Sequence, residues 1–155
     1  MDFDLTLAGY RCFAPDAPAT LSFRDDVVAF VGVNNSGKST LLRAVYELRS
    51  TFKALLDSEQ FKNALTGNVG FNPPAEIGDP DGIYWHFGQT DIQVELVLRT
   101  RSGAISQKLG ITIARKYRRV SLTLYDVDGK PVPQDGNWNF SNNVPFKQGF
   151  NLGLS

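Results

Sequence analysis

The chain has 155 residues, a length that fits one domain. Its 16 lysines and arginines balance 16 aspartates and glutamates, so the net charge by itself does not identify any kind of partner. It has neither an apolar run of the roughly 18 residues that a membrane span needs nor the basic and apolar N-terminal stretch of a signal peptide. Its one cysteine, Cys12, excludes an internal disulfide, and we expect a cytoplasmic protein without membrane association.

The N-terminal part of the chain predicts three strands. Residues Phe3–Leu7 alternate apolar with polar or small side chains, and Leu21–Phe23 suggests a shorter strand of the same kind. The continuous apolar run Val27–Val31 is typical of a strand that is buried on both faces of a parallel sheet. Pro15 and Pro18 mark a loop before the second strand.

An amphipathic helix is predicted next, from inside a glycine-containing loop to about Asp57 or as far as Phe61. Charged residues, Arg43, Glu47, Arg49 and Lys53, occupy its predicted polar face. The apolar residues that recur at helical spacing are Leu41, Leu42, Val45, Leu48, Phe52, Leu55 and Leu56.

The remainder predicts a loop followed by antiparallel sheet. Residues 66–89 are rich in glycine, proline, asparagine and aspartate, which favour irregular structure. Alternation over 92–98, 109–113 and 120–124, with turn residues near 102 and 117, predicts three strands joined as a meander. Residues 131–155 show no clear period.

The loop before the helix has the pattern of a phosphate-binding loop, Gly32-Val33-Asn34-Asn35-Ser36-Gly37-Lys38-Ser39. Its glycines allow the backbone N–H groups to turn inward around an anion, and the helix N-terminus adds unpaired donors. Lys38 would contact the β- and γ-phosphates, the Ser39 hydroxyl would ligate Mg²⁺, and Thr40 would donate on the α-phosphate side. The predicted nucleotide-binding residues are Gly32, Asn34, Asn35, Ser36, Gly37, Lys38, Ser39 and Thr40, with Ser39 also as the metal ligand.

The segment Gly32–Leu42 resembles the phosphate loop of ABC-type ATPases of the SMC–RecF and OLD groups. The resemblance covers about Met1 to Leu56 and places Gly9–Phe13 where those proteins have an Asn-Phe-Arg-Ser-Phe-like segment. It implies that Arg11 lies near the nucleotide phosphates and that Asn35 contacts the γ-phosphate. It also implies a preference for ATP over GTP. The sequence contains no guanine-reading Asn-Lys-x-Asp motif.

The expected fold is therefore α/β: a P-loop NTPase core of strand, P-loop and helix, with an antiparallel β-subdomain, as in the N-terminal lobe of an ABC-type ATPase. The resemblance implies ATP and Mg²⁺ as cofactors and nucleotide-controlled dimerisation, with a second head or partner supplying the signature motif. Proteins of these groups act in DNA metabolism or phage defence, and many OLD members are coupled to a nuclease.

Several parts of a complete ATPase are missing from the 155 residues. No buried strand ends in Asp-Glu as a Walker B motif, since Val120–Asp126 alternates like a half-exposed hairpin strand, and no Ser-Gly-Gly signature is present. Gln148 is a candidate for the Mg²⁺-ligating glutamine that, in the family, links the two lobes. No catalytic residue is therefore assigned. We expect either an incomplete N-terminal lobe, completed by further chain, or a degenerate protein that binds nucleotide without hydrolysing it.

Two further interpretations stay open. The run from Arg99 to Arg119 contains seven basic residues and no acid, so it could contact the phosphate backbone of DNA, or it could be a set of solvated strand ends. The chain could also be a regulatory module that senses a nucleotide without turnover, or an interaction protein whose loop no longer binds nucleotide.

Overall fold

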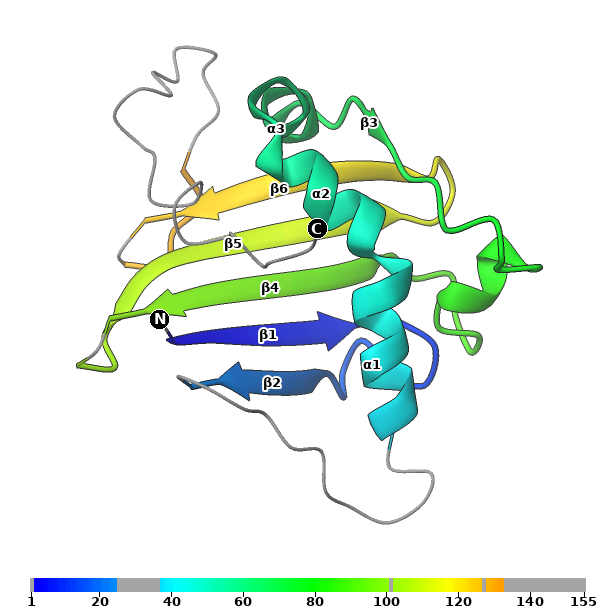
Figure 1. Ribbon diagram of the computed structural model, residues 1–155, viewed down its shortest axis with the longest axis horizontal. Helices are drawn as coiled ribbons and strands as arrows, with labels where there is room; N and C mark the ends of the chain where they lie inside the picture. Colours follow the sequence, from blue (N-terminus) through cyan, green and yellow to red (C-terminus); the bar gives the residue numbers. More distant parts are fainter. Residues whose placement is uncertain (1, 25–36, 101, 127, 133–155) are drawn as a thin grey trace.

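The computed structural model describes residues 2–24, 37–100, 102–126 and 128–132. The expected strand Val27–Val31 and the first part of the phosphate loop, Gly32–Ser36, lie outside these residues. The elements in chain order are β1 (Asp2–Ala8), β2 (Ala19–Phe23), α1 (Lys38–Glu47), α2 (Arg49–Leu56), α3 (Ser58–Leu65), β3 (Val69–Gly70), the 3-10 helix η1 (Pro80–Ile83), β4 (Ile92–Arg99), β5 (Ile105–Ala114) and β6 (Arg119–Tyr125) (Figure 1).

The strands form a single sheet in the order β2-β1-β4-β5-β6-β3. Every pairing in it is antiparallel among the described strands. Directly opposite residues share a face, and on one face they form apolar rows that cross the sheet. One row is Leu21, Leu5, Leu96, Leu109 and Leu124, and another is Ala19, Leu7, Val94, Ile111 and Leu122.

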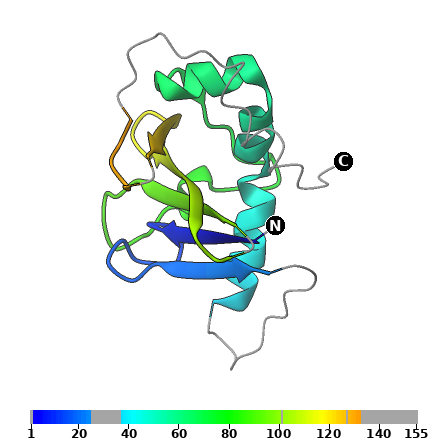
Figure 2. The same cartoon turned by 90° about the vertical axis from the view of Figure 1, so that its left-hand side faces the viewer.

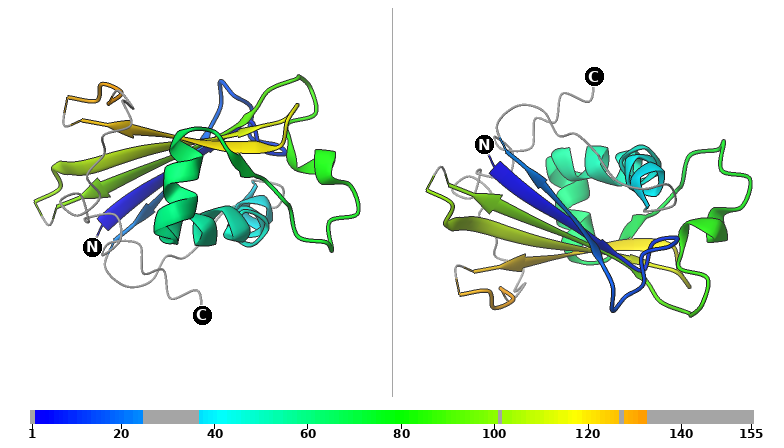
Figure 3. Two further views of the ribbon diagram at one scale, coloured as in Figure 1. Left: turned by 90° about the horizontal axis from the view of Figure 1, so that it is seen from above. Right: turned by 90° about the horizontal axis from the view of Figure 1, so that it is seen from below.

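The two faces of the sheet differ in chemistry. All three α-helices lie over the apolar face, as the edge-on views show (Figures 2 and 3). The strand positions between the apolar rows carry polar side chains such as Thr6, Thr20, Thr112 and Ser121 on the opposite face. This alternation is what the period of an antiparallel strand with one solvated face produces.

The helical region is divided in three, where the apolar spacing predicts one helix. Leu48 separates α1 from α2, and Asp57 separates α2 from α3 with an extended backbone (φ −83°, ψ 130°). The Asp57 side chain caps α3 by accepting hydrogen bonds from the backbone N–H groups of Glu59 and Gln60, both at 2.9 Å. The chain can therefore bend from β1 and β2 across to β6, against which α3 packs.

The buried face of α1 also differs from the prediction. Leu41, Ala44 and Leu48 pack into the core, whereas Leu42 and Val45, which were expected to face it, are 56% and 36% exposed. Glu47, which was expected on the polar face, is only 4% exposed. The stripe that meets the sheet is therefore rotated around the helix axis relative to the predicted stripe.

The expected fold class, an α/β P-loop NTPase core with a separate β-subdomain, is wrong for the described residues. Such a core needs a parallel sheet flanked by helices, and the structure has one six-stranded antiparallel sheet with three short helices on one face. The physical reason is that β1 pairs on both sides, with β2 and with β4, so the N-terminal strands and the meander form one sheet.

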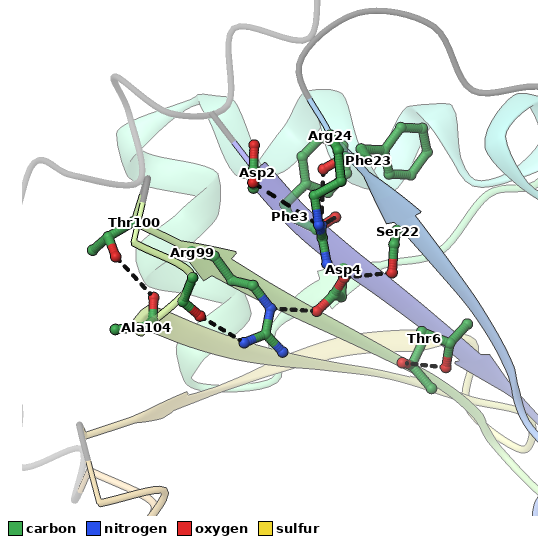
Figure 4. A network of polar contacts seen from close by, with 12 residues as sticks. Asp2, Phe3, Asp4, Thr6, Ser22, Phe23, Arg24, Arg99, Thr100 and Ala104 are labelled. Atoms are coloured by element: carbon green, nitrogen blue, oxygen red, sulfur yellow. Dashed lines mark hydrogen bonds and ion pairs between the residues drawn. The ribbon is translucent and has the colours of Figure 1, made fainter.

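A polar network on the outer face joins β1, β2 and β4 around Asp4 (Figure 4). Ser22 Oγ and Arg24 Nη2 donate to Asp4 Oδ1 at 2.7 and 2.6 Å, and Arg99 Nε donates to Oδ2 at 2.6 Å. Burial by itself would raise the pKa of Asp4, but these three donors outweigh it and lower the pKa to about 2. The carboxylate thus connects three strands through charge-assisted hydrogen bonds.

We expect Asp4→Asn to lower the free energy of unfolding by about 1–2 kcal/mol at pH 7. Because the folded pKa of Asp4 lies below its ordinary value of 3.8, its contribution is complete above about pH 5 and is lost as the pH falls toward 2. Urea unfolding of both proteins at several pH values would measure the difference. The exposed loop residue Asp16 supplies the control substitution Asp16→Asn. A difference that does not shrink with acid would contradict this account of Asp4.

Candidate functional site

The described end of the phosphate loop forms the start of α1. Gly37 is the residue before the helix and adopts a left-handed conformation (φ 83°), which a side chain would disfavour. Lys38, Ser39 and Thr40 make up the first turn, where Ser39 is exposed and its two neighbours are half-buried. The Leu41 N–H donates to the Gly37 carbonyl at 2.9 Å. The structure therefore places the Gly-Lys-Ser-Thr sequence at a helix N-terminus, as the motif requires.

The N-terminus of α1 differs from that of α3 in the groups that could satisfy its backbone donors. At α3 the Asp57 carboxylate caps the first turn, which also contains Glu59. At α1 the capping position is a glycine, which has no side chain to accept a hydrogen bond, and the first turn contains no acid. The helix dipole and the N–H groups of this turn would favour an anion.

A second segment of the chain, Gly9–Phe13, lies against the start of α1. A β-carbon placed on Gly37 would come within 2.9 and 3.1 Å of two atoms of the Phe13 ring and 3.8 Å of the Cys12 sulfur. A side chain at this position would therefore displace the Phe13 ring, in addition to straining the backbone. The resemblance placed this segment near the nucleotide, and the structure brings it to the described end of the phosphate loop.

Arg11 makes an ion pair with Glu47 at the other end of α1. Its Nη2 lies 2.6 Å from Glu47 Oε1, and its Nε lies 3.1 Å from Oε2. The Tyr10 hydroxyl also donates to Oε2, at 2.5 Å. The expected contact between Arg11 and a phosphate stays a prediction. In this structure the guanidinium is directed to the C-terminal end of α1, about 15 Å along the helix from Gly37.

Two side chains of this cluster, Tyr10 and Arg11, have raised pKa values. Burial raises the pKa of the Tyr10 phenol, and the adjacent Glu47 carboxylate raises it further. Burial would lower the pKa of the Arg11 guanidinium, but its hydrogen bonds to Glu47 and Tyr10 more than compensate and raise it. Tyr10 therefore stays a neutral donor and Arg11 stays a cation throughout the physiological pH range.

Sequence reasoning did not find the roles of Tyr10 and Glu47. The sequence predicts Glu47 on the polar face of the helix and gives no separate role to Tyr10 within the segment Gly9–Phe13. The signal that could have found Glu47 is the small residue Ala44, which forms a buried stripe with Leu41 and Leu48 at helical spacing. Glu47 follows Ala44 by three positions and so lies on that stripe.

The basic run Arg99–Arg119 does not form one continuous surface. Arg99 lies at one end of the long strand β5 and Arg115–Arg119 at the other, about 30 Å away by strand geometry, while Arg101 lies outside the described residues. Several of these cations are engaged: Arg99 with Asp4, Lys108 with Glu95 and Arg118 with Asp81. DNA contact through this run stays a prediction.

The structure also bears on the Walker B segment, on metal and membrane association, and on the remaining loop residues. Val120–Asp126 largely coincides with β6, an alternating antiparallel strand, which agrees with the hairpin interpretation. Within the described ranges no three His, Cys, Asp or Glu side chains cluster as a metal site, and none of the helices there has the length and apolar character that crossing a bilayer requires. The other predicted loop ligands, Gly32, Asn34, Asn35 and Ser36, and also Gln148, lie outside the described residues.

Comparison with known proteins gives no relative: the chain matches no protein-family model and no curated protein. The resemblance to ABC-type ATPases therefore rests on the loop Gly32–Leu42 and on the position of the segment before it.

We expect Gly37→Ala to destabilise the protein more than Gly103→Ala does. Both glycines have a left-handed backbone (φ 83° and 84°), but an added β-carbon has open space at Gly103 and meets Phe13 at Gly37. Each substitution should cost about 1–2 kcal/mol from backbone strain, and the Phe13 contact should add about 1 kcal/mol or more at Gly37. Urea unfolding measures both values, and equal losses would show that Phe13 does not pack tightly on Gly37.

Proposed function

We propose that the chain binds the triphosphate of ATP, together with Mg²⁺, at the N-terminus of α1. The observation that carries this proposal is the sequence Gly37-Lys38-Ser39-Thr40 at the start of an amphipathic helix, with the glycine in a left-handed conformation. A positive helix end, a lysine and two hydroxyls in one turn supply the donor groups that a polyphosphate needs. ATP is proposed over GTP only because of the loop resemblance.

Each residue of the turn has a separate role in this proposal. The backbone N–H groups would donate to phosphate oxygens, and the Lys38 ammonium group would balance the charge of the β- and γ-phosphates. The exposed Ser39 hydroxyl would be a ligand of Mg²⁺, which neutralises part of the phosphate charge when it is bound. Thr40, half-buried in the same turn, would donate on the α-phosphate side.

Hydrolysis is proposed only for a protein in which further groups complete the site. An ATPase needs a carboxylate that holds Mg²⁺ and positions water, and the resemblance attributes this group and the signature motif to other parts of an OLD-, RecF- or SMC-like ATPase. The 155-residue chain should therefore bind ATP with negligible turnover.

Action on DNA, a nuclease partner and cytoplasmic location are further expectations of the same proposal. A chain that only senses nucleotide is the alternative.

We expect Lys38→Ala to weaken ATP binding by roughly ten- to hundredfold, because one charge-assisted contact contributes about 1.5–3 kcal/mol. Isothermal titration calorimetry with and without Mg²⁺ would measure the affinity. Lys53→Ala, at an exposed position of α2, is the matched control and should bind like the unmodified chain. ATP affinity that is independent of both Lys38 and Mg²⁺ would refute the proposal. Rapid multiple turnover by the purified chain would refute the assignment of hydrolysis to a completed site.

A further inference from the structure

The carboxylate of Glu47 connects two parts of the chain that are far apart in sequence. It is 4% exposed, and it accepts hydrogen bonds from the Tyr10 hydroxyl at 2.5 Å and from the Arg11 guanidinium at 2.6 and 3.1 Å. Tyr10 is itself completely buried. A buried carboxylate is tolerated because these donors replace its lost hydration.

The segment that supplies these donors has a fixed shape. Tyr10 and Phe13 exchange backbone hydrogen bonds at 2.8 and 3.2 Å, which makes Gly9–Phe13 a tight turn. Arg11 within this turn has a left-handed backbone (φ 48°), a conformation that costs energy for a residue with a side chain. The Arg11 N–H donates to the Ile83 carbonyl at 2.9 Å, and the Trp85 N–H donates to Gly9 at 2.9 Å, so the turn is fixed to the loop before β4.

This turn contacts α1 near both ends. Tyr10 and Arg11 reach Glu47, the last residue of the helix, while Phe13 and Cys12 lie at Gly37, the residue before its first turn. Gly37 and Glu47 are ten residues apart, a distance of about 15 Å along the helix. The helix is therefore held against one rigid turn by a polar contact at its C-terminal end and by ring packing at its N-terminal end.

We propose that Glu47 is a positioning residue for the polyphosphate site, because its bonds to Tyr10 and Arg11 hold α1 so that Gly37 meets Phe13. The effect of Glu47 on ATP binding rests on the proposed function. Its effect on the position of the helix does not. Without the carboxylate, α1 could rotate or slide against the turn. The N–H groups of its first turn would then be less well aligned with the phosphates, and binding depends steeply on such alignment.

The first experiment tests the position of α1 without any ligand. Hydrogen exchange followed by mass spectrometry would compare the unmodified chain with Glu47→Gln, which removes the charge but keeps the size of the side chain. We expect the amides of Gly9–Phe13 and of the first two turns of α1 to exchange at least about threefold faster in the variant. The matched control is Glu95→Gln, which removes a carboxylate paired with Lys108 at 2.8 Å on β4, and it should leave these amides unchanged.

The second experiment tests the consequence for binding. At a temperature where every variant is fully folded, we expect Glu47→Gln to weaken Mg²⁺–ATP binding by roughly three- to tenfold, although Gly37, Lys38, Ser39 and Thr40 are unaltered. Tyr10→Phe, which removes one of the donors to Glu47, should give a smaller loss in the same direction and serves as a second variant if Glu47→Gln does not fold. A purely structural role would lower the melting temperature without changing the affinity of the folded protein.

The outcomes separate the two proposals. Unchanged exchange in Glu47→Gln and Tyr10→Phe would overturn the positioning role, and so would faster exchange combined with unchanged ATP affinity. If the unmodified chain binds no ATP, the proposed function fails on its own. Faster exchange would in that case still support the part of the inference that concerns the helix position.

Discussion

The structure depends on a sheet that is apolar on one face only. The residues of β1, β2, β4, β5 and β6 that lie opposite one another form continuous apolar rows on that face, and burying them requires a cover of helices. Because the opposite face is polar, the three helices all pack on the same side (Figure 3). The direction of α1, and with it the place where the phosphate loop ends, follows from this one-sided packing.

Within this packing, a polar contact adds to the hydrophobic contacts that orient α1. Apolar side chains position a helix through the complementarity of their shapes, whereas a buried carboxylate also needs its donors in defined positions. Glu47 therefore adds a directional constraint that Leu41, Ala44 and Leu48 do not provide. A polar group in the interior has this effect only when it is fully satisfied, as Glu47 is by Tyr10 and Arg11.

The sequence predicted the parts of the structure that depend on local pattern. Alternation located β1, β2 and the meander β4–β6, because a half-buried strand shows its period directly. It did not predict that β1 pairs with β4, since strand partners are chosen by packing between distant segments. The same holds for Glu47, because helical spacing alone assigned the stripe with Leu42 and Val45 to the core. The start of α1 at Gly37-Lys38-Ser39 was predictable because it is a motif with a local geometry.

The position of β1 between β2 and β4 has a consequence for folding during synthesis. The N-terminal strand pairs first with β2, its neighbour in sequence, but Leu5 also lies opposite Leu96. During synthesis the first two strands can therefore form only an isolated ribbon, which is marginally stable in water, until β4 (Ile92–Arg99) has also emerged. A chain shortened by its first eight residues would leave β4 as an open edge with unpaired backbone groups, which invites association with other chains.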